Sequence, residues 1–93
     1  LFENEKVRVI DTCIHPGKIT NLHTHQWPSS LYILSWSHFI RYDESGNVIV
    51  DSRSLQSLPQ AHSALWSQPL LPHRLENVGD TDLHVISTEI KTQ

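Results

Sequence analysis

The sequence is poor in several residue types that define common protein classes. It has no Met, one Cys and only three Gly in 93 residues. The single cysteine, Cys13, excludes an intrachain disulfide, so the fold cannot depend on the disulfide framework that stabilises many small secreted domains. A lone thiol is compatible with a reducing compartment, and we expect a cytoplasmic protein.

Long apolar runs and an excess of positive charge are also missing. No apolar stretch approaches the roughly 18 residues of a membrane-spanning helix. The chain has 7 Lys+Arg against 10 Asp+Glu, a formal net charge of −3. This balance argues against a nucleic-acid-binding or anionic-membrane-binding surface. No export signal is visible. Because the chain starts at Leu1 and lacks Met, we expect its N-terminus to have been shortened.

Helical periodicity is absent as well, and β-strand patterns take its place. The length suits one small domain, so we predict a single domain over residues 1–93. Short runs of β-branched, aromatic and aliphatic residues are separated by turns containing Gly, Pro, Asp or Asn. Such a chain favours an antiparallel sandwich or barrel, and the strand count fits a jelly roll around a ligand-holding interior. The predicted strands cover residues 2–15, 19–25, 31–36, 37–42, 48–50, 63–67, 73–78 and 82–90, and the first of these segments could be one strand or a strand pair.

The connections between these segments carry recognisable turn chemistry. Pro16-Gly17 predicts a tight turn, and the polar stretch 43–47 predicts a hairpin loop. Residues 51–60 are expected to form a loop with room for one helical turn. Pro69 and Pro72 are expected to frame a stiff bend. Residues 31–36 are nearly all apolar, which predicts a strand buried on both faces.

Histidine is unusually abundant, with seven residues against seven Lys+Arg. His23 and His25 are two positions apart, so on a strand they point to the same face, which we expect to be the inward face shared with Ile19 and Asn21. Imidazole is the commonest metal ligand among side chains. These two residues therefore predict half of a metal site.

A third histidine completes the predicted site. His73 opens a later strand on which Leu75 and Asn77 share its face. In a two-sheet barrel that face meets His23 and His25 across the interior. Three imidazoles would bind one divalent metal and leave positions open for water or substrate.

The order and spacing of these residues resemble those of the cupins. Gly17 followed after five residues by His23-Thr24-His25 matches the first cupin motif, and Pro69 with the run His73–Asn77 matches the end of the second. The resemblance covers nearly the whole chain and is to small single-domain cupins. It implies an all-β fold, the antiparallel double-stranded β-helix or jelly-roll barrel, with a metal held by His23, His25 and His73.

The chain departs from the cupin pattern at one ligand. The first motif usually includes a metal-binding Glu, which would fall near Ser29 or Ser30, and no carboxylate lies between His25 and Asp43. A three-histidine site can still hold Fe, Zn, Ni or Mn. Without a carboxylate the site carries less negative charge, which lowers its affinity for hard ions such as Mn²⁺.

Several other residues are open to two interpretations. His62 is an additional ligand candidate, but its position in a loop also fits an ordinary exposed histidine. Cys13 could line the cavity or be a small buried core residue. Arg41 and Tyr42 could each anchor an acidic substrate, and alternation alone does not decide which of them points inward.

Two functional hypotheses of different classes follow. The first is a metal-dependent enzyme of dioxygenase, isomerase or hydrolase type that acts on a small oxygen-containing organic molecule. The second is a non-catalytic domain that binds or senses a small molecule, with a structural metal or none. A scaffold with incidental histidines is a weaker third. We also predict a homodimer, because so small a barrel has edge strands to protect and its N-terminal strand could pair across subunits.

Overall fold

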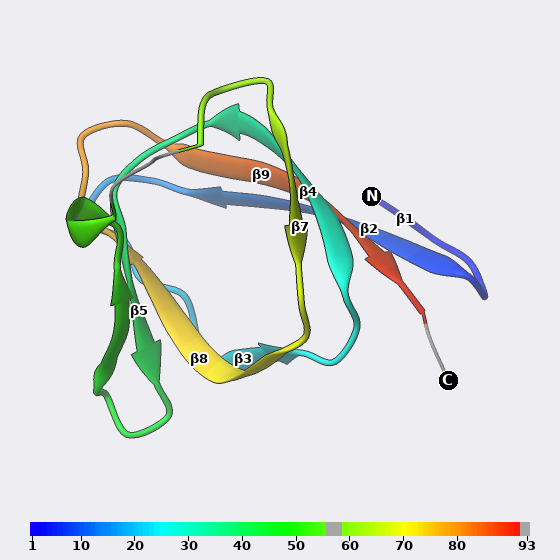
Figure 1. Cartoon of the computed structure of the whole chain (residues 1–93), viewed down its shortest axis with the longest axis horizontal. Coiled ribbons are helices and arrows are strands. Elements are labelled where there is room, and N and C mark those ends of the chain that lie inside the picture. Colours follow the sequence, from blue (N-terminus) through cyan, green and yellow to red (C-terminus); the bar gives the residue numbers. More distant parts are fainter. Residues whose placement is uncertain (56–58, 92–93) are drawn as a thin grey trace.

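Strands account for nearly all regular structure in the computed structural model, which describes residues 1–55 and 59–91 (Figure 1). The only helical element in these residues is one 3-10 turn, η1 (Ser52–Ser54). The described residues contain no helix long and apolar enough to cross a membrane. The strands are β1 (Phe2–Glu3), β2 (Val7–Ile14), β3 (His23–His25), β4 (Ser29–Ser35), β5 (Phe39–Asp43), β6 (Val48–Asp51), β7 (Ala64–Ser67), β8 (Leu70–Asn77) and β9 (Leu83–Ile90).

The strands form two antiparallel sheets that together enclose an interior (Figure 1). One sheet has the order β1-β2-β9-β4-β7 and the other has the order β3-β8-β5-β6. Neighbours such as β2 and β9, or β8 and β5, are far apart in the sequence, as in a jelly roll. The predicted all-β antiparallel jelly-roll barrel is confirmed.

The interior is a cavity more than a packed core. Alternation on β2 directs Arg8, Ile10, Thr12 and Ile14 inward, and on β9 it directs Leu83, Val85 and Ser87 the same way. Among the described residues the buried hydrophobic side chains are Ile14, Ile33 and Leu83. The two sheets therefore stay far enough apart to leave a cavity of about 450 Å³.

The turns and loops agree with the sequence in most places. Gly17 and Gly46 have φ angles of +80° and +89°, as their predicted turns require. The helical turn expected within residues 51–60 is η1. Residues 56–58 of that predicted loop lie outside the described residues.

Three expectations are corrected by the structure. The strand predicted over 19–25 is reduced to β3, and Ile19 is 52% exposed instead of inward. Pro72 lies within β8, so no bend separates Pro69 from His73. Its missing N–H is tolerated because the pairing of β3 with β8 is irregular between His23 and His25. β4 is not buried on both faces, since Tyr32 is 42% exposed.

Candidate metal centre

The three predicted histidines converge inside the barrel. β3 supplies His23 and His25, and β8 supplies His73, which pairs directly opposite His23. The expectation that His73 meets the other two across the interior is wrong, because β3 and β8 are neighbouring strands of the same sheet. One nitrogen from each ring lies within 4.8 Å of the other two. The ring centroids are 4.3 Å apart for His23 and His73, and 5.0 Å for His23 and His25. His73 is buried at 4% exposure, and the other two rings line the cavity.

The Nδ1 atoms of the three rings all face acceptor groups. Nδ1 of His23 lies 2.8 Å from the Asn21 carbonyl oxygen, and Nδ1 of His73 lies 2.8 Å from the Leu71 carbonyl oxygen. A carbonyl can only accept, so each of these Nδ1 atoms carries the proton. Nδ1 of His25 lies 3.5 Å from Oε2 of the Glu89 carboxylate, which can only accept. The Nε2 atoms are therefore left with the free lone pairs.

The buried setting favours neutral imidazoles. Burial lowers the pKa of His25, and the nearby His23 lowers it further. Burial also lowers the pKa of His73. Neutral imidazole is the form that binds a metal, and a hydrogen bond from Nδ1 to a carbonyl or carboxylate is the usual support of a metal-bound histidine. The residues present thus fit a divalent transition metal held through three Nε2 atoms.

A buried carboxylate supports the site from the opposite sheet. Glu89 is fully buried on β9, and its Oε1 accepts a hydrogen bond of 2.7 Å from Arg8 Nε. Its Oε2 is buried without a hydrogen bond and faces His25. The sequence analysis missed this residue, although strand alternation places Glu89 on the same face as Leu83, Val85 and Ser87.

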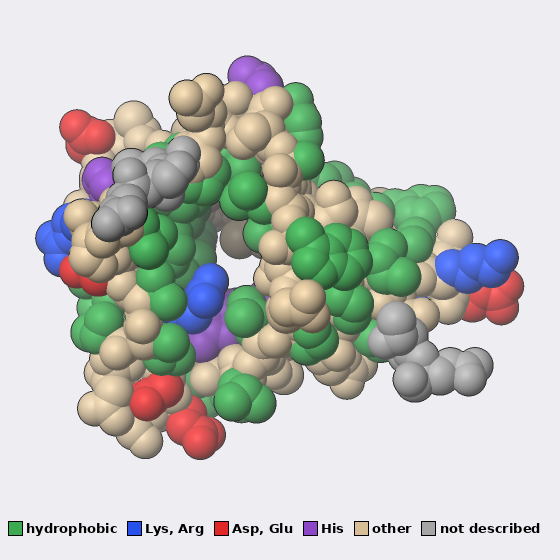
Figure 2. All heavy atoms as spheres, viewed as in Figure 1, with side chains coloured by type: hydrophobic (Ala, Val, Ile, Leu, Met, Phe, Trp, Pro, Cys, Tyr) green, Lys and Arg blue, Asp and Glu red, His purple; other side chains and the backbone are tan. Residues whose placement is uncertain are grey.

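Two arginines, Arg8 and Arg41, line the same cavity. Arg8 is neutralised by Glu89. Arg41 comes from β5, and its Nε is buried without a hydrogen-bond partner. Burial lowers the pKa of Arg41, although the ordinary pKa of a guanidinium is so high that it stays charged. Figure 2 shows a hollow in this face of the molecule. Blue side chains, which are Arg or Lys, and purple side chains, which are His, lie at the hollow. The cavity thus combines three imidazoles with an uncompensated positive charge.

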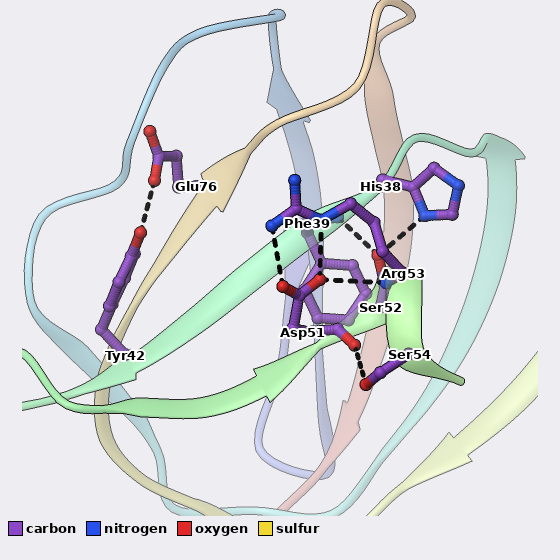
Figure 3. A network of polar contacts seen from close by, with 8 residues as sticks. All are labelled: His38, Phe39, Tyr42, Asp51, Ser52, Arg53, Ser54 and Glu76. Carbon is purple, nitrogen blue, oxygen red and sulfur yellow. Dashed lines mark hydrogen bonds and ion pairs between the residues drawn. The ribbon is translucent and has the colours of Figure 1, made fainter.

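The structure settles the open interpretations of the neighbouring residues. Arg41 points inward, whereas Tyr42 donates a hydrogen bond of 2.6 Å to Glu76 (Figure 3). His62 is exposed and lies near Tyr32, apart from the three clustered histidines. Cys13 is exposed, so neither the cavity-lining nor the buried-core interpretation is right. Its alternate neighbours Thr12 and Ile14 take the inward positions of β2.

Solved structures with the same fold are found for this chain. A cupin domain from Bordetella pertussis Tohama I superposes with a TM-score of 0.77 at 21% identity, covering 98% of this chain and 88% of that one. An RmlC-like cupin from Desulfovibrio desulfuricans gives 0.57 at 13% identity, covering 96% and 76%. An oxalate decarboxylase gives 0.59 at 18% identity over 92% of this chain, which spans only 22% of that protein.

No family model and no curated protein matches the chain in sequence. At such low identities the likeness to solved structures establishes the fold, and the chain has the cupin fold.

Proposed function

We propose that this cupin-fold chain holds one divalent transition metal at His23, His25 and His73 and acts on a small oxygen-containing organic acid. The single observation that carries the proposal is the orientation of the three imidazoles. Each Nδ1 faces an acceptor, so the three Nε2 lone pairs remain for a common ion. An all-nitrogen donor set suits Zn, Fe or Ni better than Mn.

A metal with three protein ligands keeps positions open, where it would polarise a substrate oxygen or activate water or dioxygen. The chain's own residues would bind and orient the substrate. Arg41 can donate two parallel hydrogen bonds to a carboxylate, and its buried Nε has no other partner. Ile10, Leu31 and Val85 supply apolar walls that exclude water and strengthen this ion pair. The cavity volume of about 450 Å³ suits a small molecule.

Metal binding is tested on untagged protein by metal analysis and by thermal unfolding with added Zn²⁺, Fe²⁺, Ni²⁺ or Mn²⁺. A metal that binds only the folded chain at 100 times its Kd stabilises it by about 2.7 kcal/mol. We expect His73→Gln to lose most of this stabilisation. The matched control is His62→Asn, which changes an exposed histidine with φ of +64° to a residue that tolerates that angle. No stabilisation of the wild-type protein by any of the four ions would contradict the proposal.

Substrate class is tested by calorimetry with small mono- and dicarboxylates and the matching neutral amides. A hydrogen bond to a charged group contributes about 1.5–3 kcal/mol, so Arg41→Gln should weaken acid binding about ten- to a hundredfold. Arg74→Gln, on an exposed position of β8, is the control and should leave affinity unchanged. Equal affinity for an acid and its amide would contradict the role of Arg41.

A non-catalytic binding or sensing domain is the second candidate. Among the described residues, those that line the cavity include no carboxylate, thiol or phenol. The carboxylate of Glu89 is already engaged by Arg8 and faces His25. A general acid or base is therefore not evident apart from the histidines. Tight binding of an acid to the metal-loaded protein without any product, under oxygen and without it, would favour this candidate over the enzyme.

A further inference from the structure

The outer face of the five-stranded sheet carries a second group of metal-binding side chains. Asp11 and Cys13 are the outward residues of β2, and His15 follows them at the next alternate position. Asp82 and His84 lie across from them at the start of β9, and Cys13 pairs directly opposite His84. Five side chains with donor atoms thus gather on one surface.

Three of these side chains lie close enough to share one ion. The ligand atoms of Cys13, His15 and Asp82 lie within 4.8 Å of one another. His15 Nδ1 is 2.8 Å from Asp82 Oδ1. The remaining two form a separate pair beside them, with His84 Nε2 2.6 Å from Asp11 Oδ1. The three residues form a compact sulfur, nitrogen and oxygen donor set, which we call the outer cluster.

The backbone beneath the outer cluster is fixed by one buried side chain. Asn77 Nδ2 donates to the carbonyl oxygen of Ile14, 2.7 Å away, and to that of Thr81, 2.8 Å away. Ile14 and Thr81 immediately precede His15 and Asp82. The Asp82 carbonyl oxygen also accepts a 2.6 Å hydrogen bond from Ser35 Oγ. The two segments that carry the ligands are therefore held together before any ion binds.

We infer that Cys13, His15 and Asp82 form a second metal site, suited to Zn²⁺ or a similar borderline-soft ion, on the outer face of the barrel. Thiolate, imidazole and carboxylate are the three ligand types of protein zinc sites, and three of them leave a fourth position for water. Soft thiolate selects Zn²⁺ over hard ions such as Mg²⁺ or Ca²⁺. The ion displaces the proton of Cys13, so binding weakens as pH falls.

This site is separate from the three-histidine centre. Alternation along β2 puts Cys13 outward, while Thr12 and Ile14 face the cavity. The sheet itself lies between the two sites. Sulfur is also present in only one of them, which gives a spectroscopic means of telling them apart.

The test uses Co²⁺ as a probe for Zn²⁺, added to the full chain with its thiol kept reduced by a phosphine. We expect a sulfur-to-cobalt charge-transfer band in the near ultraviolet that disappears when Zn²⁺ is added. In His73→Gln, which removes a ligand of the inner site, the band should saturate at one ion per chain. Cys13→Ser should abolish the band. His15→Gln and Asp82→Asn should each weaken binding about tenfold or more, since even the indirect supports of metal ligands have effects of this size.

Two control variants complete the design. His73→Gln should keep the charge-transfer band, because it alters only the inner site, and His62→Asn should leave both sites intact. Circular dichroism checks that each variant is folded. No charge-transfer band in the wild-type protein would overturn the inference. A band that is unchanged in both His15→Gln and Asp82→Asn would also overturn it, and so would saturation of the band at one ion per two chains. Either result would mean that the outer cluster of one chain does not bind the ion as a unit.

Discussion

At the scale of single residues, Asn77 holds together the segments that carry the outer cluster. It is fully buried at the end of β8, four residues after His73. Its Nδ2 donates to the carbonyls of Ile14 and Thr81, and its Oδ1 accepts from Ser37 Oγ and the Gly79 N–H. All four of its side-chain hydrogen bonds are made. This one amide therefore connects β2, β8, the turn between β8 and β9, and the segment before β5.

We predict that Asn77→Ala destabilises the fold by about 3 kcal/mol or more, because it leaves several buried polar groups without partners. Asn47→Ala, at an exposed position of the β5–β6 hairpin, should cost about 1 kcal/mol or less. Urea unfolding of both variants measures the difference. Similar losses in the two variants would contradict the role assigned to Asn77.

How far single residues could be predicted from the sequence depended on local spacing. The His23, His25 and His73 cluster followed from strand alternation and motif spacing. Glu89 and Arg8 were missed because charged residues on strands are usually solvent-facing, and only the register of β2 with β9 pairs them inside the barrel. The sequence left the orientation of Arg41 undecided, because the exact start of β5 determines which face of the sheet its side chain occupies.

At the scale of elements, β2 and β9 act as one ladder with two chemical faces. Their pairing runs without irregularity from Val7 opposite Ile90 to Ile14 opposite Leu83. The inner face presents Arg8 and Glu89 at one end and mainly apolar residues along the rest, together with Thr12 and Ser87. A one-residue slip would exchange the two faces, so the register is strongly specified by this burial.

The Arg8–Glu89 pair leads to a prediction about this ladder. Arg8→Met should destabilise the fold more than Glu89→Gln does, because it leaves a fully buried carboxylate without its partner, a loss of about 3–5 kcal/mol for buried pairs. The double variant Arg8→Met with Glu89→Gln should recover part of this loss. Denaturant unfolding of all three variants checks the order. Equal effects of the two single substitutions would show that the unpaired charge of Glu89 is not the cause of the lost stability.

The contacts at the β6–η1 junction predict that the stability of the fold depends on pH. Asp51 accepts hydrogen bonds from the backbone and guanidinium of Arg53 (Figure 3), and these contacts lower its pKa from 3.8 to about 2. Because the folded chain binds this proton less readily than the unfolded chain, the stabilising contribution is present above pH 3.8 and is lost as the pH falls through about 2.

The measurement is an NMR titration of the Asp51 carboxyl carbon. A midpoint near the ordinary value for Asp51 would contradict the contact. Arg53→Gln should raise the midpoint toward that value.

Element boundaries were predictable where turns marked them. Gly17 and the 43–47 loop ended strands as expected. β8 began three residues earlier than predicted because Pro72, which favours loops in isolation, is accommodated where β3 is irregular. The sequence around Pro72 does not indicate this irregular pairing with a distant strand.

At the scale of the whole molecule, the barrel encloses a cavity in place of a tightly packed core. Few hydrophobic side chains are fully buried among the described residues, while many large ones are exposed, including Phe2 at 56% and Trp66 at 59%. The overall fold could be predicted because strand count, turn chemistry and the two histidine motifs all agreed. A ligand-holding interior was expected from this fold, but the size of the cavity could not be predicted, since it depends on how far apart the two sheets stand.

We predict a homodimer in solution that pairs through the open edge of the five-stranded sheet. The edge strands of this sheet are β1 and β7, and the pairing is expected at β1, where both residues are exposed. Light scattering at tens of micromolar should give twice the chain mass, and Phe2→Lys should shift the protein toward monomer because an edge charge opposes strand pairing. Ile49→Lys, on the exposed edge strand β6 of the other sheet, is the control. A wild-type monomer at these concentrations would contradict the prediction.

The central claim is that the three inward histidines bind one metal through their Nε2 atoms. Anomalous diffraction from a crystal of the protein loaded with Zn²⁺ tests it most directly. The account predicts a zinc peak inside the barrel, about 2.0–2.1 Å from Nε2 of His23, His25 and His73. A crystal with full zinc occupancy at the outer cluster and no peak between these three rings would contradict it.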